Sequence, residues 1–168
     1  MKWLLYALGS IAILIVLLAL VGAMLPKTHT ATRQIRLRQT PDAVYALITA
    51  PADWRGLQGV EQLPPANGRK RWKEIDGHNQ ITYELIEATP PAKMVTRIAD
   101  ESLPFGGTWT YMISTDGNAT ILRVTEDGEV RNPIFRFVSR FIMGHTATLD
   151  KYLTAVGKKF GEPITIED

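Results

Sequence analysis

The sequence predicts an α+β domain: a curved antiparallel sheet of about six or seven strands packed against a long C-terminal helix, with two short helices and an N-terminal transmembrane helix. Three observations support this class. An uncharged apolar segment occupies the amino terminus. Alternating apolar and polar segments, separated by turn dipeptides, fill the middle of the chain. Apolar residues with a helical period follow near the carboxyl terminus.

The amino-terminal segment Trp3–Leu25 carries no charge over 23 consecutive residues. At about 1.5 Å per residue a helix of this length spans roughly 35 Å, enough to cross a hydrocarbon core of about 30 Å. Trp3 and Tyr6 are expected to contact the membrane interface, which favours amphipathic rings. We therefore expect a retained single-pass anchor over residues 1–27. A signal peptide cleaved near Val21-Gly22-Ala23 is the alternative, although signal-peptide cores usually have only about 7–15 apolar residues.

The net charge of the chain comes from the two lysines that flank the apolar segment. The formal net charge is +2, and residues 28–168 carry 17 basic and 17 acidic residues once Lys2 and Lys27 are set aside. A neutral domain disfavours a nucleic-acid platform, which needs a sustained cationic field. The basic residues after the apolar segment favour a cytoplasmic domain, whereas so short an amino-terminal tail favours the opposite topology. The absence of cysteine excludes disulfides, thiolate metal ligands and a cysteine nucleophile.

The soluble part is expected to begin with a short polar tether at residues 28–32 and a half-buried strand at residues 33–39. Thr40-Pro41-Asp42 then has the composition of a helix start, with an N-cap, a proline at the first helical position and an early acid. A second short helical segment begins at residues 51–54.

Turn dipeptides divide the middle of the chain into hairpins, since Asn-Gly and Asp-Gly suit tight turns. They are Asn67-Gly68, Asp76-Gly77, Asp116-Gly117 and Asp127-Gly128. The expected strands lie at about 58–64, 69–75, 80–87, 93–99, 107–115 and 119–126. Glu84, Arg97 and Arg123 are expected on the solvated outer face of this sheet.

Asn132-Pro133 is expected to begin one long helix that runs to about Phe160, with Gly144 as a point where it can kink. Its apolar positions keep a 3.6-residue period, and His145 shares their face. The folded domain is therefore predicted over residues 33–162, followed by a tail at residues 163–168.

This order of elements resembles the START-like, birch-allergen-like helix-grip (SRPBCC) superfamily, in particular its bacterial polyketide cyclase/dehydrase-like branch. The similarity lies in residues 104–111, 126–137 and 144–153, and it covers about residues 30–162. The resemblance implies a cavity between sheet and C-terminal helix. Known members hold lipids, sterols or polyketides there; some are enzymes and many only carry a ligand.

A dry void of about 300 Å³ would cost on the order of 7 kcal/mol at ~24 cal/mol per Å³. That is comparable with the whole stability of a small domain, about 5–15 kcal/mol. A ligand, water or bulky side chains must therefore fill the gap. The side chains expected to line it are Trp54, Tyr83, Trp109, Tyr111, Phe141 and Tyr152, each of which could instead fill the core.

Two titratable residues are candidates for chemistry. His145 could act as a general acid or base or orient a polar ligand head, or it could simply be satisfied by a neighbouring hydroxyl or carboxylate. Glu126 could point into the cavity or be solvated at the end of a hairpin. No serine-nucleophile elbow, phosphate-binding glycine loop or paired-histidine motif occurs in the sequence, and its three histidines are widely separated. We expect neither a cofactor nor a metal.

The predicted last helix is also basic, with six Lys and Arg residues and one acid over residues 131–160. Phe135, Arg136 and Arg140 could rest on an anionic membrane surface, or Phe135 and Ile142 could pack beneath the loop near Pro104-Phe105 while the cations are solvated.

The leading hypothesis is a membrane-anchored domain that binds a lipid- or isoprenoid-like molecule without turning it over. The alternatives are a cyclase- or dehydrase-type enzyme that uses His145 with Glu126 or Tyr83, and an interaction module with a closed interior. The sequence assigns no oligomeric state.

Overall fold

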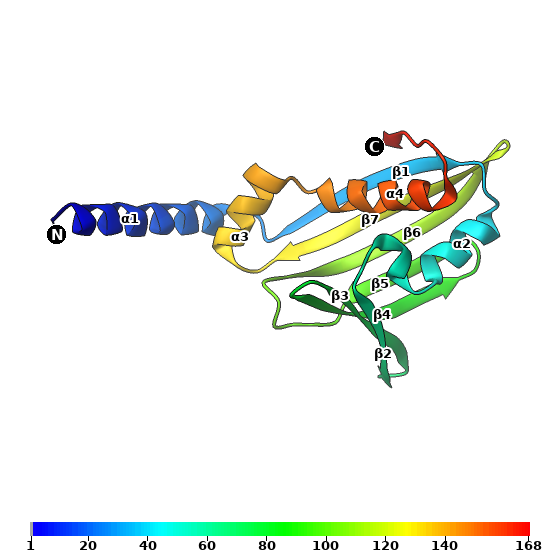
Figure 1. The fold of residues 1–168 in the computed structure, drawn as a ribbon, viewed down its shortest axis with the longest axis horizontal. Helices are drawn as coiled ribbons and strands as arrows, with labels where there is room; N and C mark the ends of the chain where they lie inside the picture. Colours follow the sequence, from blue (N-terminus) through cyan, green and yellow to red (C-terminus); the bar gives the residue numbers. More distant parts are fainter. Residues whose placement is uncertain (1) are drawn as a thin grey trace.

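A computed structural model describes residues 2–168 and shows one antiparallel sheet of eight strands in the order β2-β3-β4-β5-β6-β7-β1-β8 (Figure 1). The strands are β1 (Thr28–Leu37), β2 (Gly59–Ala66), β3 (Arg69–Asp76), β4 (Asn79–Thr89), β5 (Lys93–Ile98), β6 (Phe105–Asp116), β7 (Ala119–Val130) and β8 (Ile166–Glu167). The helices are α1 (Lys2–Met24), α2 (Pro41–Thr49), the 3-10 helix η1 (Ala52–Arg55), α3 (Pro133–Val138), the π-helix η2 (Ser139–Met143) and α4 (Ala147–Phe160). The predicted α+β class is confirmed.

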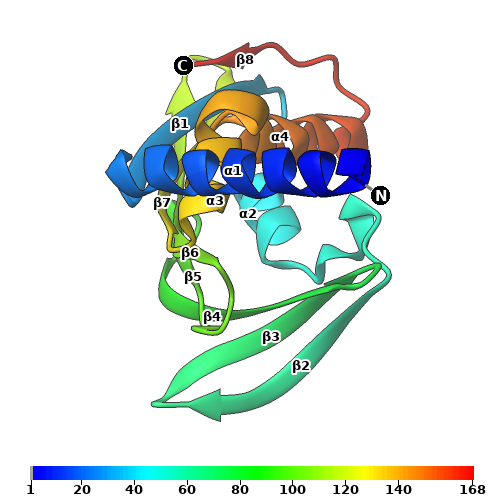
Figure 2. The ribbon, with the colours of Figure 1, turned by 90° about the vertical axis from the view of Figure 1, so that its left-hand side faces the viewer.

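The sheet curves around α4 and α2, which lie on the same side of it (Figure 2). Consecutive strands from β2 to β7 pair antiparallel with their neighbours. Glycines with positive φ lie at three of the connecting turns, where a left-handed backbone is needed: Gly68, Gly77 and Gly117 each follow Asn or Asp. This meander is what brings inward-facing side chains from distant strands to one concave surface.

The core lies between the concave face of the sheet and α4. Leu149, Leu153 and Val156 are fully buried on α4, at the helical spacing that keeps them on one face. They meet the inward-facing residues of β1 and β7, such as Ile35 and Leu122. Burial of this stripe fixes α4 on the sheet.

α1 projects away from one end of the domain (Figure 1). Its side chains are exposed over most of its length, and it is 23 residues long. Within residues 2–168 it is the one helix long and apolar enough to cross a membrane.

The C-terminal helix is not continuous, and this part of the prediction is wrong. The chain forms α3 and η2, breaks at Gly144 with φ +76°, and starts α4 afresh at Ala147. Gly144 can adopt this φ because it lacks a Cβ atom. Of the predicted long helix, therefore, only the α4 part packs on the sheet.

The predicted tether and tail also differ from the structure. Residues 28–32 belong to β1, because β7 extends to Val130 and supplies backbone partners along that whole length. Residues 166–167 form β8, which pairs with Gln34 and Ile35 at one edge of the sheet. At the other edge, β2 carries Pro64-Pro65 at a shift in its register with β3.

Glu84 is not solvated as predicted. Its side chain lies on β4 between Arg71 on β3 and Arg97 on β5, and the residue is only 4% exposed. It forms ion pairs with Arg97 and, at 3.6 Å, with Arg69. The surrounding guanidinium groups cover the carboxylate and neutralise it.

Candidate functional site

A cavity of about 360 Å³ lies between the concave face of the sheet, α2, η1 and α4. Its apolar wall includes Ile48, Val60, Leu85 and Met94. Exposed residues such as Lys70 and Thr49 also line it and form a rim open to solvent. The space between sheet and helix is therefore not closed by the protein's own side chains.

An aromatic cluster forms one side of this cavity. Tyr152 on α4 is its centre, with ring centroids 5.8 Å from Trp54, 5.6 Å from Trp109 and 5.6 Å from Tyr111. Trp54, Tyr111 and Tyr152 line the cavity, whereas Trp109 packs behind Tyr152. The cluster joins η1, β6 and α4 at one point.

An ion pair forms the polar part of the wall. Arg55 on η1 pairs with Glu74 on β3, and the indole nitrogen of Trp72 donates to the same Glu74 oxygen at 3.1 Å. The guanidinium carbon of Arg55 lies 5.4 Å from the ring centroid of Tyr152, within range of a cation–π contact. Burial opposes the charge of Arg55, but Glu74 and nearby tyrosines outweigh it, and the pKa of Arg55 is raised.

The cavity tyrosines remain protonated at neutral pH. Burial raises the pKa of Tyr111 to about 12, and it raises that of Tyr152 as well. The Tyr111 hydroxyl shares hydrogen bonds with Thr96 and Tyr152. These phenols can therefore orient a ligand through hydrogen bonds, but they do not serve as bases.

Tyr83 and Glu126 lie beside the cavity rather than in its wall. Tyr83 on β4 stacks on Trp72, with ring centroids 5.8 Å apart. Glu126 on β7 is half-buried and hydrogen-bonded to Trp109, and burial raises the pKa of its carboxyl group. Neither side chain is among the described residues that line the cavity.

Phe141 and His145 are placed elsewhere, contrary to the expected lining. Phe141 on η2 is 60% exposed and packs against Phe137. His145 stacks on His29 with ring centroids 4.0 Å apart, and its Nδ1 lies 3.3 Å from the Ser139 hydroxyl. The break at Gly144 turns these side chains away, because a helical phase cannot be carried across a non-helical residue. The structure does not bring His145 to the central cavity with Glu126 or Tyr83.

The polar wall was not anticipated from the sequence. Arg55 follows Trp54 directly, and Glu74 shares the face of β3 with Trp72, two residues earlier. The strand alternation could have placed Glu74 inside. Nothing in the sequence indicates that Arg55 pairs with it.

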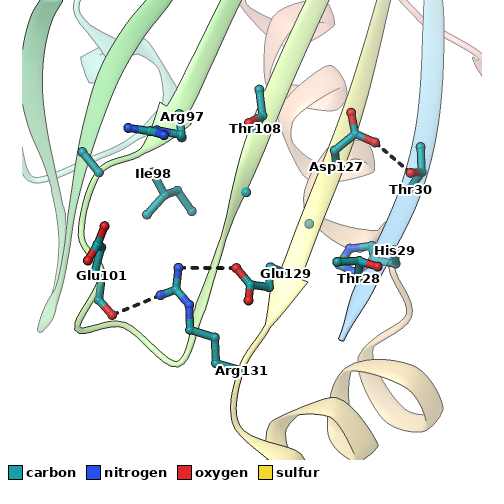
Figure 3. A pocket seen from close by; sticks show the side chains of 13 residues that line it. Thr28, His29, Thr30, Arg97, Ile98, Glu101, Thr108, Asp127, Glu129 and Arg131 are labelled. Atoms are coloured by element: carbon teal, nitrogen blue, oxygen red, sulfur yellow. Dashed lines mark hydrogen bonds and ion pairs between the residues drawn. The ribbon is translucent and has the colours of Figure 1, made fainter. Parts of the chain in front are cut away.

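A second hollow, of about 370 Å³, lies on the face of the sheet turned away from α4 (Figure 3). Several of its charged groups are engaged within the protein: Arg131 pairs with Glu129 at 3.6 Å, and the Thr30 hydroxyl donates to Asp127 at 2.7 Å. Gly107 and Gly128 allow close packing at this point: a Cβ atom on Gly107 would meet the main chain of Asp127, and one on Gly128 would meet the His29 ring. This polar hollow suits water better than an apolar ligand.

The residues expected to contact a membrane fall into two groups. Trp3, Tyr6, Phe135 and Arg140 are exposed. Arg136 is only 7% exposed and donates to the main-chain oxygen of Leu25 at 3.0 Å and of Ala23 at 3.4 Å. Because the last carbonyl groups of a helix need donors, Arg136 caps α1 and does not lie on the surface as expected.

Within residues 2–168, no group of three or more His, Asp or Glu side chains is arranged to hold a metal ion.

No protein-family model matches the chain, and no curated protein matches it. Several solved structures share its fold. Norcoclaurine synthase from Thalictrum flavum matches 81% of this chain and 88% of its own, with 12% identity and a TM-score of 0.60. Major latex-like protein 151 from Panax ginseng matches 80% of this chain and 96% of its own, with 13% identity and a TM-score of 0.59.

The di-domain ARO/CYC StfQ from the steffimycin biosynthetic pathway matches 80% of this chain and 52% of its own length, with 9% identity and a TM-score of 0.59. At this level of identity the similarity concerns architecture alone. Together with the curved sheet closed by α4, it shows that the chain has the helix-grip fold.

Proposed function

We propose that this protein binds an apolar small molecule, lipid- or isoprenoid-like, in the central cavity while α1 anchors it to a membrane. The observation that carries the proposal is the cavity itself: about 360 Å³, walled by aromatic and aliphatic side chains and open at a rim. Pockets of this size and lining are typical of small-molecule sites. An interaction module with a closed interior would need this space filled.

Energetics support an occupant. A dry void of this volume would cost on the order of 9 kcal/mol at ~24 cal/mol per Å³. Water can fill it, but Val60, Leu85 and Met94 offer water no hydrogen bonds. An apolar ligand that displaces such water gains about 25 cal/mol for each Å² of apolar surface that it buries.

The polar wall supports orientation of the ligand. The Arg55–Glu74 pair is neutral overall, and one guanidinium nitrogen, Nε of Arg55, is buried without a hydrogen-bond partner in the described part of the chain. A ligand hydroxyl or carbonyl against this wall could instead bond to the polar groups that line the cavity, such as the Tyr111 and Tyr152 hydroxyls. We therefore favour a ligand with an apolar body and one polar end.

Binding without turnover is favoured by the placement of titratable groups. Proton-transfer groups must lie within hydrogen-bond reach of one reacting centre. His145 lies in a different pocket from the aromatic cluster, Glu126 is engaged by Trp109, and the cavity phenols are held protonated.

The test is saturable uptake of a fluorescent apolar probe, dansyl-undecanol, by the full chain in lipid nanodiscs. Met94→Trp places a large ring in the cavity, whereas Met112→Trp places the same ring on the outer face of the next strand; these methionines are 5% and 44% exposed. We expect Met94→Trp to weaken uptake at least about tenfold, since bulk in a pocket displaces its ligand. Met112→Trp should bind as the parent does.

Uptake that is absent from the parent, or that survives Met94→Trp unchanged, would overturn the proposal. Near-ultraviolet circular dichroism of both variants checks that they fold.

The anchor is proposed on the exposure and composition of α1. A helix of 23 residues whose apolar side chains face outward is unstable in water and stable in a bilayer. Resistance of the protein to alkaline extraction from membranes, together with an intact mass that includes α1, is the expected result. A mature protein that lacks residues 1–23 would instead identify a cleaved signal peptide.

A further inference from the structure

A small pocket of about 180 Å³ lies where the end of α1, the start of β1 and η2 meet. We call it the junction pocket. The charged side chains among its lining residues are Lys27, Arg136 and Arg140, accompanied by His29 and His145. No described residue that lines it is acidic.

The positive charge at this point is not neutralised within the described part of the chain. Lys27 and Arg140 are exposed and take part in none of its ion pairs, which join other cations to carboxylates. The Nε atom of Arg136 is buried and has no hydrogen-bond partner among the described residues. The negative end of the α1 dipole compensates Arg136 only in part. A cluster of this kind is stabilised by an anion.

Exposed apolar side chains lie directly beside these cations. Phe141 and Ile142 follow Arg140 on η2 and are 60% and 71% exposed, and Phe135 on α3 is exposed as well. Cationic and apolar groups side by side match the boundary between headgroups and acyl chains in a bilayer. A soluble anion such as inorganic phosphate would gain no binding energy from these apolar side chains.

The junction pocket is held at a fixed position along α1. Gly22 packs against the main chain of Pro133 so closely that a Cβ atom would overlap the Pro133 carbonyl oxygen. Arg136 ties the same two helices together through the main-chain oxygens of Ala23 and Leu25. Figures 1 and 2 both show α3 against the C-terminal part of α1. A bilayer that contains α1 therefore ends at the level of the pocket.

We propose that the junction pocket binds the phosphate headgroup of an anionic phospholipid, with Phe141 and Ile142 against the acyl region of the same leaflet. The proposal rests on the membrane anchoring proposed above. Lys27 and Arg140 would contact the phosphate, and the donor groups of Ser139 and His145 lie in the same pocket. The site is distinct from the central cavity and would fix the orientation of the domain on the membrane.

The experiment counts lipids retained by the full chain, by native mass spectrometry after release from nanodiscs of phosphatidylcholine mixed with phosphatidylglycerol. The test variant is Lys27→Gln/Arg140→Gln. The matched control is Lys158→Gln/Lys159→Gln, which removes the same charge from exposed residues in the last turn of α4. We expect the parent and the control to retain phosphatidylglycerol preferentially, and the test variant to lose that preference by about tenfold or more.

Equal retention of the two lipids by the parent, or the same loss in both variants, would overturn the proposal. Competition by inorganic phosphate at low concentration would also overturn it, because that result identifies a soluble anion as the ligand.

A second measurement separates this proposal from the anchoring on which it rests. The chain has no cysteine, so a single cysteine can carry an environment-sensitive dye at Leu14→Cys or Ile142→Cys, with Asn118→Cys in the distant β6–β7 turn as the aqueous reference. Dye at position 14 exposed to water would contradict the anchoring. If the dye at position 14 is in lipid, two results at position 142 would contradict only the junction site. The dye there would either be exposed to water or be buried in protein, away from both water and lipid.

Discussion

The guanidinium group of Arg55 and the carboxylate of Glu74 form an ion pair in the wall of the central cavity. The pair connects η1, which follows α2, to β3 on the far side of the cavity. Because both side chains are largely shielded from water, each depends on the other for its charge to be compensated. The same pair thus supports the cavity wall and supplies its polarity.

Replacement of Arg55 by Met should destabilise the protein by about 1–3 kcal/mol, since it leaves the buried Glu74 charge with only the Trp72 indole as partner. This corresponds to a melting temperature lower by roughly 2–10 °C in a thermal scan of the full chain. Arg36→Met, which breaks the exposed pair with Asp116, should cost less than about 1 kcal/mol. An equal loss of stability in Arg55→Met and Arg36→Met would show that the cavity ion pair stabilises the protein no more than the exposed one.

Glu126→Gln should raise the melting temperature at neutral pH and leave it nearly unchanged near pH ~4. Burial raises the pKa of the Glu126 carboxyl group. As the pH rises above the ordinary range of a glutamate, the unfolded state therefore releases its proton first and is favoured. The neutral amide removes this penalty and can still accept a hydrogen bond from Trp109. Lower stability of the variant at neutral pH would contradict the assignment, and Glu61→Gln, an exposed position, is the control.

The stacked histidines should make the protein less stable in mild acid. Burial lowers the pKa of both imidazoles. The charge of His145 lowers the pKa of His29 further, although Asp127 opposes this effect. Arg140 likewise lowers the pKa of His145 further. The unfolded state then binds protons first as the pH falls below about 6.5, so stability decreases through that range.

His145→Gln should reduce this loss between about pH 7.5 and pH 5.5, measured as the difference between two melting temperatures. His78→Gln, in an exposed turn, should leave the loss unchanged. A parent protein that is equally stable at both values would argue against the stacked pair.

Gly22→Leu should separate α3 from α1, because any side chain at position 22 collides with the main chain of Pro133. Overpacking of this kind costs about 1–3 kcal/mol, and here it would be released by local undocking. Faster amide hydrogen exchange over residues 133–143 is the expected readout. Gly9→Leu is the matched control, since nothing lies within 4 Å of a Cβ atom at that position. Unchanged exchange in Gly22→Leu would mean that the two helices are not held together.

The hairpin order of the sheet was predictable because each signal is local. Asp116-Gly117 is a tight turn between β6 and β7, and strand alternation put Tyr111 on the concave face. The helical period of α4 likewise predicts that Tyr152 faces the sheet. In the structure, Tyr111 and Tyr152 both lie in the cavity wall. Patterns within one element are sufficient for such assignments.

The remaining features depend on partners that are distant in the sequence. Glu84 is buried because the register places arginines on both neighbouring strands, and no local pattern reports that register. Arg136 is buried because it meets α1, more than a hundred residues earlier in the chain. Phe141 was misplaced because the helical period was extended through Gly144.

The two edge strands of the sheet, β2 and β8, differ from its inner strands. One outer strand contains Pro64-Pro65, which lack main-chain donors, and the other is only two residues long. At the β2 edge the two prolines interrupt the row of main-chain donors that a second molecule would need to extend the sheet. Neighbouring copies are therefore kept from joining through β2 into an extended β-structure.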